Sequence, residues 1–271
     1  MTHVSLDGMV GIAAGNGFQS PGPSDFEFPD IFNGNQVLLA KSSLLLVLGG
    51  TVVAAFFLIT TRRMSIVPSK SQYFSEEAYG FVRNGIAQDI IGGRDYMRFV
   101  PLLTTMFFFI LVNNLFGLIP FLQFAPFSRA GFAYALAAMV WVVYNGVGIA
   151  RHGFGAYLKL QTVPAGVPVW ILPLLVPLEF LSNLIIRPIT LSLRLFANMF
   201  AGHLLLTLFA TGGAYLLFDA TGSFLVKPAG ILSFILGILV GFLELIVSVL
   251  QAYVFTLLTA TYIQGSLAAE H

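Results

Sequence analysis

Three ionisable side chains lie deep inside long apolar stretches of the sequence: Arg194, His203 and Glu244. An arginine at the centre of a membrane helix costs about 2.5–3.5 kcal/mol on insertion scales, and it keeps its charge. Imidazole changes charge near neutral pH, and a carboxyl group in an apolar environment can exchange a proton at the working pH. A lone arginine could instead pair with a helix terminus or a buried carboxylate, and a lone histidine is usually a core residue. Taken together, the three residue types favour proton transfer within a membrane.

The surroundings of Arg194 strengthen this interpretation. At 100° per residue, one helical face within about 40° of a line carries five polar groups. They are Asn183, Arg187, Thr190, Arg194 and Asn198. Such a stripe is costly against lipid, so we expect it to face protein or a water-filled path. Glu179 lies about 60° from Arg194 and is one possible ion-pair partner, whereas His203 lies on the opposite side of the helix.

The last apolar stretch carries a second polar face. Within about 40° of one line it holds Glu244, Ser248, Gln251 and Phe255. We expect Glu244 and His203 to lie on adjacent antiparallel helices, where they could pass protons. A stripe of small residues would let the two helices approach closely, although ordinary tight packing would also explain it. The stripe consists of Gly230, Gly237 and Gly241.

Other chemistry has little support in the sequence. The chain has no cysteine, which excludes disulfides, thiolate metal sites and cysteine nucleophiles. The four histidines are scattered and form no HExxH pattern, so we expect no metal site; they are His3, His152, His203 and His271. There is no glycine-rich phosphate loop followed by Lys and Ser or Thr, and no GxSxG motif. We therefore expect a non-catalytic protein without a cofactor.

The elements that must hold these residues are membrane helices. The 271 residues are 57% hydrophobic and 9% charged, against about 25% charged in soluble domains. The net charge of +1 gives no reason to expect a nucleic-acid partner. The sequence thus predicts an all-α integral membrane protein embedded in a lipid bilayer.

Five spans are predicted, because a crossing needs about 20 apolar residues. They lie near 37–61, 99–125, 131–150, 170–218 and 229–264. The last two exceed one perpendicular crossing, so we expect a long, strongly tilted hairpin. Bends are plausible at three prolines, Pro173, Pro177 and Pro188.

Two further segments complete the predicted organisation. Residues 1–36 read as a polar amino-terminal arm outside the cytoplasm without signal-peptide features, and residues 37–271 as one transmembrane domain. Residues 75–94 predict a short amphipathic helix at the membrane surface, beginning near Ser75 with Glu76 and Glu77 behind it. A helix in a water-exposed loop is the alternative for this segment.

The distribution of basic residues predicts the orientation. Eight of the thirteen Lys and Arg residues follow the first or third span, namely Arg62, Arg63, Lys70, Arg83, Arg94, Arg98, Arg151 and Lys159. Three fall on the opposite side, namely Lys41, Arg129 and Lys227. Positively charged loops stay in the cytoplasm, so the amino terminus is predicted outside and the carboxyl terminus inside.

Three sequence blocks resemble the a subunit of F-type ATP synthases. They are RPITLSLRLFANMFAGHLLL around Arg194, VLQAYVFTLLTATYI with Gln251, and NNLFGLIP with Asn114. The resemblance covers most of residues 38–266 and implies two offset half-channels that serve a rotating ring of c subunits. It also implies a peripheral stalk of b subunits and other Fo and F1 subunits as partners.

The resemblance implies a role for each polar group. Arg194 would be the essential charge between the half-channels and would face the c ring. The inlet half-channel from outside would use His203, Glu244, Asn198, Gln251, Asn114 and Ser248. The outlet half-channel to the cytoplasm would use Glu179, Asn183 and Arg187. We favour protons over sodium ions, and a bacterial plasma membrane over a mitochondrial or chloroplast one.

The sequence departs from the more familiar pattern of the family in two ways. The positions of His203 and Glu244 carry an acidic residue and a histidine in some members, so here the pair is exchanged. Glu179 lies about one residue further from the arginine than the family's glutamate. An unrelated secondary ion transporter is the alternative function, but it would predict internal repeats, and none is seen in the sequence.

Overall fold

The computed structural model describes residues 41–62, 65–93, 95–119, 125–163, 170–219 and 227–268, together with Gly22. All regular structure in these residues is helical, which confirms the predicted all-α class. The predicted arm over residues 1–36 lies outside the described residues, apart from Gly22.

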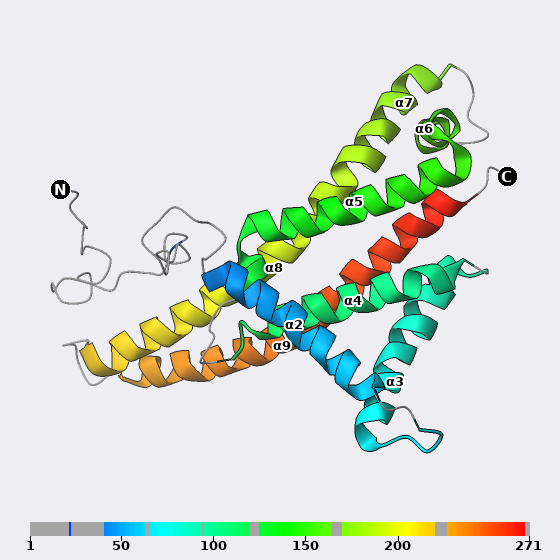
Figure 1. Cartoon of the computed structure of the whole chain (residues 1–271). Helices are drawn as coiled ribbons and strands as arrows, with labels where there is room; N and C mark the ends of the chain where they lie inside the picture. Colours follow the sequence, from blue (N-terminus) through cyan, green and yellow to red (C-terminus); the bar gives the residue numbers. More distant parts are fainter. Residues whose placement is uncertain are drawn as a thin grey trace, which may run out of the picture.

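Five helical runs are long and apolar enough to cross a membrane, as predicted (Figure 1). Three are single helices, α2 (Lys41–Thr61), α4 (Tyr96–Leu115) and α5 (Ala130–His152). The fourth joins α7 (Leu172–Phe180), the π-helix η5 (Leu181–Ile186), α8 (Arg187–Ala214) and the π-helix η6 (Tyr215–Asp219). The fifth is α9 (Lys227–Leu267), and the shorter elements η4 (Pro126–Ser128) and α6 (Phe154–Thr162) lie between spans.

The second span ends earlier than the predicted 99–125. Helix α4 stops at Leu115, and the Gly117 N–H donates to the Asn114 carbonyl in a tight turn. A β-carbon on Gly117 would lie 3.1 Å from the Ala125 β-carbon and 3.2 Å from His203 Nε2. Glycine therefore lets the chain after α4 fold back closely over α8, and this turn ends the span.

The predicted helix over 75–94 is longer at its start and changes type midway. It begins as α3 (Lys70–Val82), capped by the Ser69 hydroxyl, which accepts from the Gln72 N–H at 3.3 Å. Ser75 therefore does not start the helix, because Ser69 supplies the cap. The second half is a π-helix, η3 (Arg83–Ile91), which packs against α4 and α9. Its position at the membrane surface stays a prediction.

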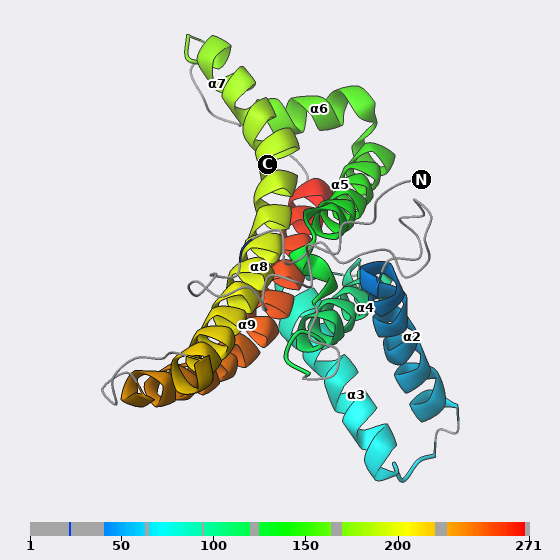
Figure 2. The same ribbon diagram turned by 90° about the vertical axis from the view of Figure 1, so that its left-hand side faces the viewer.

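The last two spans form the predicted antiparallel hairpin, in which α8 and α9 run side by side (Figures 1 and 2). The expected close approach at the small residues is confirmed. A β-carbon on Gly230 would lie 3.2 Å from the Gly213 carbonyl oxygen, and one on Gly237 would lie 3.3 Å from the Phe209 β-carbon.

The 41 residues of α9 extend about 61 Å at 1.5 Å per residue. That is twice a hydrocarbon core of about 30 Å, so α9 must be strongly inclined.

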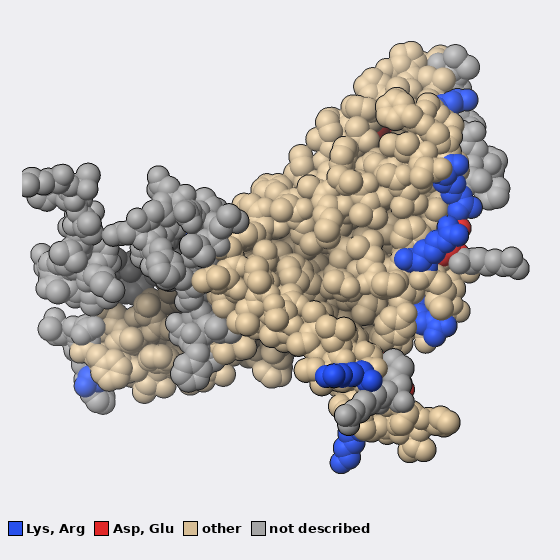
Figure 3. All heavy atoms as spheres, in the orientation of Figure 1, with Lys and Arg blue, Asp and Glu red and all other residues tan. Residues whose placement is uncertain are grey.

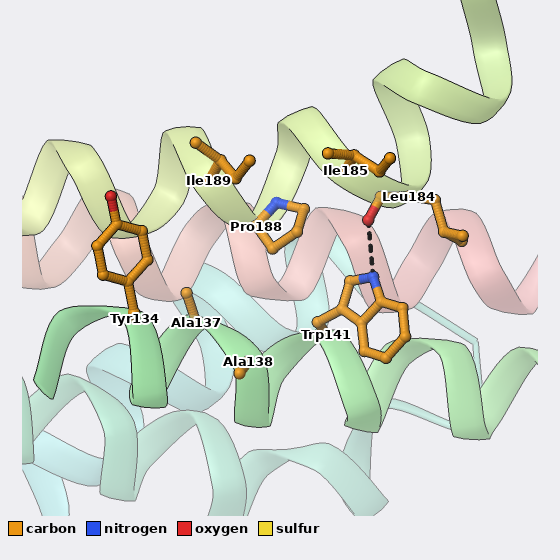
Figure 4. Close-up of a pocket in the computed structure, with 8 residues that line it drawn as sticks. All are labelled: Tyr134, Ala137, Ala138, Trp141, Leu184, Ile185, Pro188 and Ile189. Carbon is orange, nitrogen blue, oxygen red and sulfur yellow. Dashed lines mark hydrogen bonds between the residues drawn. The ribbon is translucent and has the colours of Figure 1, made fainter. Parts of the chain in front are cut away.

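The fourth span bends where its hydrogen bonding changes. The Arg187 N–H donates to the Ser182 carbonyl five residues back, and Pro188 has no N–H to give. The carbonyls of Asn183 and Leu184 are thereby released from the helix. Figure 4 shows the Trp141 indole N–H donating to the Leu184 carbonyl at 2.9 Å, beside an apolar groove between α5 and the bend. Of the three candidate prolines, Pro188 marks the bend.

On the face shown in Figure 3, most of the visible Lys and Arg side chains lie along one edge, which includes the end of α5 and the start of α4. At this edge Arg151 Nη1 donates to Asp95 Oδ2 at 2.6 Å, and Arg98 lies 3.9 Å from the same carboxyl group. The hydrogen bond from Arg151 lowers the pKa of Asp95. The ion pair joins the beginning of α4 to the end of α5.

Candidate functional site

Arg194 lies on an uncovered face of α8. Its neighbours Leu191, Leu195 and Met199 are buried in the core, whereas Arg194 itself is exposed. Within the part of the chain that the structure describes, no carboxylate lies within 4 Å of its guanidinium. The ion pair with Glu179, which the sequence left as one possibility, is therefore not formed. A guanidinium against lipid is costly, so this face of α8 requires a polar or charged partner.

A first group of buried polar residues, which we call the His–Glu cluster, lies between α8, α9 and the end of α4. It consists of Asn114, His203, Glu244, Ser248 and Gln251. All five side chains are at most 7% exposed. The polar face predicted for α9 is thus turned inward, although its residues lie in a span with lipid-exposed leucines and isoleucines on its other sides.

Glu244 and His203 are both placed by close contacts with glycines. A β-carbon on Gly202 would lie only 2.8 Å from Glu244 Oε1, so the carboxyl group rests directly on the backbone of α8. His203 follows Gly202 in α8, and its Nε2 lies against Gly117 in the turn after α4. The carboxyl group of α9 therefore lies against Gly202, and the imidazole of the next residue in α8 lies against the turn after α4.

Several polar atoms of the His–Glu cluster have no hydrogen-bond partner among the described residues. They are both amide atoms of Asn114, Glu244 Oε2, Ser248 Oγ and Gln251 Nε2. Buried polar groups in proteins are ordinarily satisfied by protein or by water. A cluster of this kind within a membrane span is a suitable lining for a hydrated proton path.

Asn198 and Asn113 flank this cluster. Asn198 is half-buried one helical turn from Arg194, and its Nδ2 also has no partner among the described residues. Asn113 is fully buried, and its Nδ2 donates to the Phe109 carbonyl at 2.8 Å. Its amide packs so closely on α2 that a β-carbon on Gly49 would lie 2.5 Å from it. The sequence motifs predict a role for Asn114 but not for Asn113.

A second group of polar residues, the Glu–Asn cluster, lies at the other end of the fourth span. Asn183 Nδ2 donates to Glu179 Oε2 at 3.1 Å and to the Gln161 carbonyl at 2.7 Å. The Tyr144 hydroxyl donates to the Asn183 carbonyl, released by the π turn, at 3.2 Å. The Arg187 guanidinium lies 5.3 Å from the ring centre of Tyr262 on α9, a cation–π contact.

The expectation that five polar residues share one face of this helix is wrong. Asn183 is buried against α5 and α6, and Arg187 is half-buried, but Thr190 and Arg194 are exposed. A π-helix turns more widely than an α-helix, so η5 shifts the register between Asn183 and Arg194. The structure thus separates Asn183 from the face that carries Arg194.

Sequence reasoning also missed the residues that support the Glu–Asn cluster. Three come from α5 and α6: Tyr144, Tyr157 and Gln161. Tyr157 is in a short helix between spans, and burial raises the pKa of its hydroxyl. A usable signal was the spacing of Trp141, Tyr144 and Asn145, which places three polar-tipped side chains on one face of an apolar helix.

Comparisons with known proteins found a matching family model and similar chains. The family model described as "ATP synthase A chain" matches residues 43–264. The chain is similar to the ATP synthase subunit a of Nocardioides sp. (strain ATCC BAA-499 / JS614), at 51% identity covering 97% of this chain and 98% of that relative. The subunit a of Arthrobacter sp. (strain FB24) is 50% identical over 77% of each chain. That of Frankia alni is 39% identical over 97% of this chain and 91% of the relative.

Proposed function

The chain belongs to the ATP synthase A chain family, and on that premise we propose that it is the stator subunit that carries protons to and from a rotating ring of c subunits. It is a multi-pass bacterial membrane protein, since its similar relatives are bacterial and five spans are present. Its partners are the c ring, the b subunits of the peripheral stalk, the remaining Fo and F1 subunits, and the lipid bilayer.

The observation that carries the proposal is the place of Arg194 between two polar clusters. At 1.5 Å per residue it lies about 14 Å along the helix from His203 and about 10 Å from Arg187. It is exposed, whereas the clusters on either side are buried or half-buried. This arrangement suits two separate proton paths that end at one exposed cation.

The inlet path uses the His–Glu cluster and Asn198. Protons entering from outside reach the seam between α8 and α9, where Glu244 and His203 can accept and pass them. Asn114, Ser248 and Gln251 supply further hydrogen-bonding groups for water. An imidazole and a carboxyl group are better suited to proton transfer than to a sodium site, whose ligands would all be oxygen atoms. This supports protons as the transported ion.

The outlet path uses the Glu–Asn cluster. Glu179, Asn183 and Arg187 lie toward the end of the fourth span at which Lys159 and Arg151 are found, the side predicted to be cytoplasmic. A proton released near Arg194 leaves toward this side. The amino terminus is then outside and the carboxyl terminus inside.

Arg194 couples the two paths. A rotor carboxyl must be protonated while it faces lipid, because a carboxylate there is costly. Near Arg194 the ionised form is favoured, so the proton leaves to the outlet and a new one arrives from the inlet. The fixed charge also repels a proton moving directly between the paths. Such leakage would waste about 2.3 kcal/mol per charge for each 100 mV of membrane potential.

The test uses inverted membrane vesicles with the assembled complex. Arg194→Ala is expected to abolish ATP-driven acidification while the c ring still co-purifies, and Arg194→Lys separates charge from guanidinium geometry. Thr190→Ala, a change at an exposed neighbour one turn away, is the matched control. Pumping near the wild-type rate in Arg194→Ala would overturn the proposal.

A further inference from the structure

The short helix α6 is held against α5 by two glycines. Gly153 has a φ of +81°, a conformation that favours glycine, and it turns the chain back after α5. Gly148 on α5 lets the ring of Tyr157 approach, because a β-carbon there would overlap the ring. Tyr157 is only 4% exposed as a result. The sequence thus places a buried tyrosine from outside the spans against a membrane helix.

The Tyr157 hydroxyl joins α5 to the end of α6. It donates to Asn145 Oδ1 at 3.1 Å and accepts from Gln161 Nε2 at 3.1 Å. A tyrosine hydroxyl is neutral at physiological pH, and burial raises the pKa of Tyr157 further, so it keeps its proton for this bond. One hydroxyl therefore fixes the position of Gln161 relative to α5.

Gln161 in turn fixes the amide of Asn183. The main-chain carbonyl of Gln161 accepts one hydrogen of Asn183 Nδ2 at 2.7 Å, and Glu179 Oε2 accepts from the same nitrogen at 3.1 Å. Both partners are acceptors, so the nitrogen, and not the oxygen, of the Asn183 amide must face them. The carboxyl of Glu179 is thus tied, through Asn183, to the backbone of α6.

We propose that Tyr157 and Gln161 are positioning residues of the outlet path, and that α6 acts as a bracket that holds Asn183 against the Glu179 carboxyl. This inference rests on the proposed function. Proton transfer needs donor and acceptor within about 2.6–3.2 Å of each other. When Asn183 is held by α6, the Glu179 carboxyl group stays within this distance of its proton-transfer partner. Without that support, the carboxyl group also occupies positions that are too far away.

The first test removes one hydroxyl. Tyr157→Phe in the complete complex removes both hydrogen bonds of this hydroxyl and is expected to slow ATP-driven acidification by at least about two- to tenfold, the effect of losing one of them. Tyr134→Phe, which removes the hydroxyl of a tyrosine 43% exposed on α5, is the control and should leave the rate unchanged. Co-purification of the c ring verifies assembly. An unchanged rate in Tyr157→Phe would overturn the proposal.

The second test distinguishes positioning from general stability. With Asn183→Ala already present, Tyr157→Phe should cause no further loss, because the connection through which it acts is gone. An equal additional loss would show that Tyr157 merely stabilises the fold, and the bracket would be wrong. If Asn183→Ala leaves too little pumping to measure, Asn183→Ser takes its place.

The two proposals can fail separately. Active pumping by Arg194→Ala removes the stator function and with it the outlet path. If Arg194→Ala is inactive and the effects of Tyr157→Phe and Asn183→Ala are additive, the proposed stator function is supported. Only the proposed role of α6 as a bracket is then contradicted.

Discussion

At the residue scale, the close contact of Gly202 with Glu244 explains why the seam between α8 and α9 carries a glycine beside the histidine. Glycine is unfavourable in a helix interior by about 1 kcal/mol relative to alanine. Here it leaves room for a carboxyl group that would otherwise lie 2.8 Å from a β-carbon. The loss of helix propensity accompanies a close approach of the Glu244 carboxyl group to the backbone of α8.

We therefore expect Gly202→Ala to displace the carboxyl group and slow ATP-driven pumping about ten- to hundredfold, as misplacement of a reacting group by about 1 Å does. Acidification of inverted vesicles measures the loss, and co-purification of the c ring verifies assembly. Gly131→Ala on α5 is the matched control, because a β-carbon there meets nothing within 4 Å. Equal rates for the two variants would show that the position of Glu244 does not limit transport.

At the element scale, the bend before α8 is a change of hydrogen-bond partners and not a loss of them. The π turn and Pro188 release two carbonyls, and α5 supplies Tyr144 and Trp141 as replacement donors. An unpaired carbonyl in a membrane span is costly, so the bend depends on these two side chains.

Trp141→Phe keeps most of the ring volume and removes only the donor to Leu184. We expect it to destabilise the purified protein by about 1–3 kcal/mol, the cost of leaving a buried carbonyl unpaired. Denaturation in detergent measures the difference. The other tryptophan, Trp170, is 81% exposed, so Trp170→Phe should have little effect.

A second variant checks the cause. Pro188→Ala restores an N–H that can donate to the Leu184 carbonyl, so Trp141→Phe should cost less in that background than alone. If the cost is the same in both backgrounds, the indole stabilises the bend through packing and not through its hydrogen bond.

The same bend marks the limit of prediction from sequence. Five spans, the hairpin and the glycine contacts of α9 follow from hydrophobic length and residue size, and the structure has them. The helical face on which Asn183 lies cannot be predicted in this way, because a helical wheel assumes the same rotation angle for every residue. The π turn η5 forms where Tyr144 is available as a tertiary donor, and the wheel contains no information about such partners.

The Ser75 start failed for a similar reason. Ser75 and Ser69 both have a side chain suited to capping, and the acidic pair after Ser75 favoured the later start. In the structure Ser69 takes the role because its hydroxyl accepts from Gln72. Local composition located the helix, and a single backbone contact decided where it begins.

At the scale of the whole molecule, the basic edge gives the orientation a direct test. The chain has no cysteine, so a single introduced one can be labelled without background. Ile66, between α2 and α3, is fully exposed, and Phe218, in η6 near the opposite tip, is 81% exposed. Both positions tolerate a smaller side chain because neither is buried.

We expect a membrane-impermeant maleimide to label Ile66→Cys in inverted vesicles but not in intact spheroplasts, and to label Phe218→Cys in the reverse pattern. Each variant serves as the control for the other. Labelling of Ile66→Cys in spheroplasts would place the basic edge outside and contradict the orientation.

The exposed face around Arg194 has a consequence for copies of the chain that have not yet assembled with the proposed c ring. A lone copy in the bilayer carries the full insertion cost of about 2.5–3.5 kcal/mol with no partner to offset it. At 1.36 kcal/mol per factor of ten, this shifts the balance between inserted and displaced helix about a hundredfold. Orphan copies should therefore be the ones that membrane proteases remove, so the charge that we propose couples the two proton paths would also control the number of copies that persist.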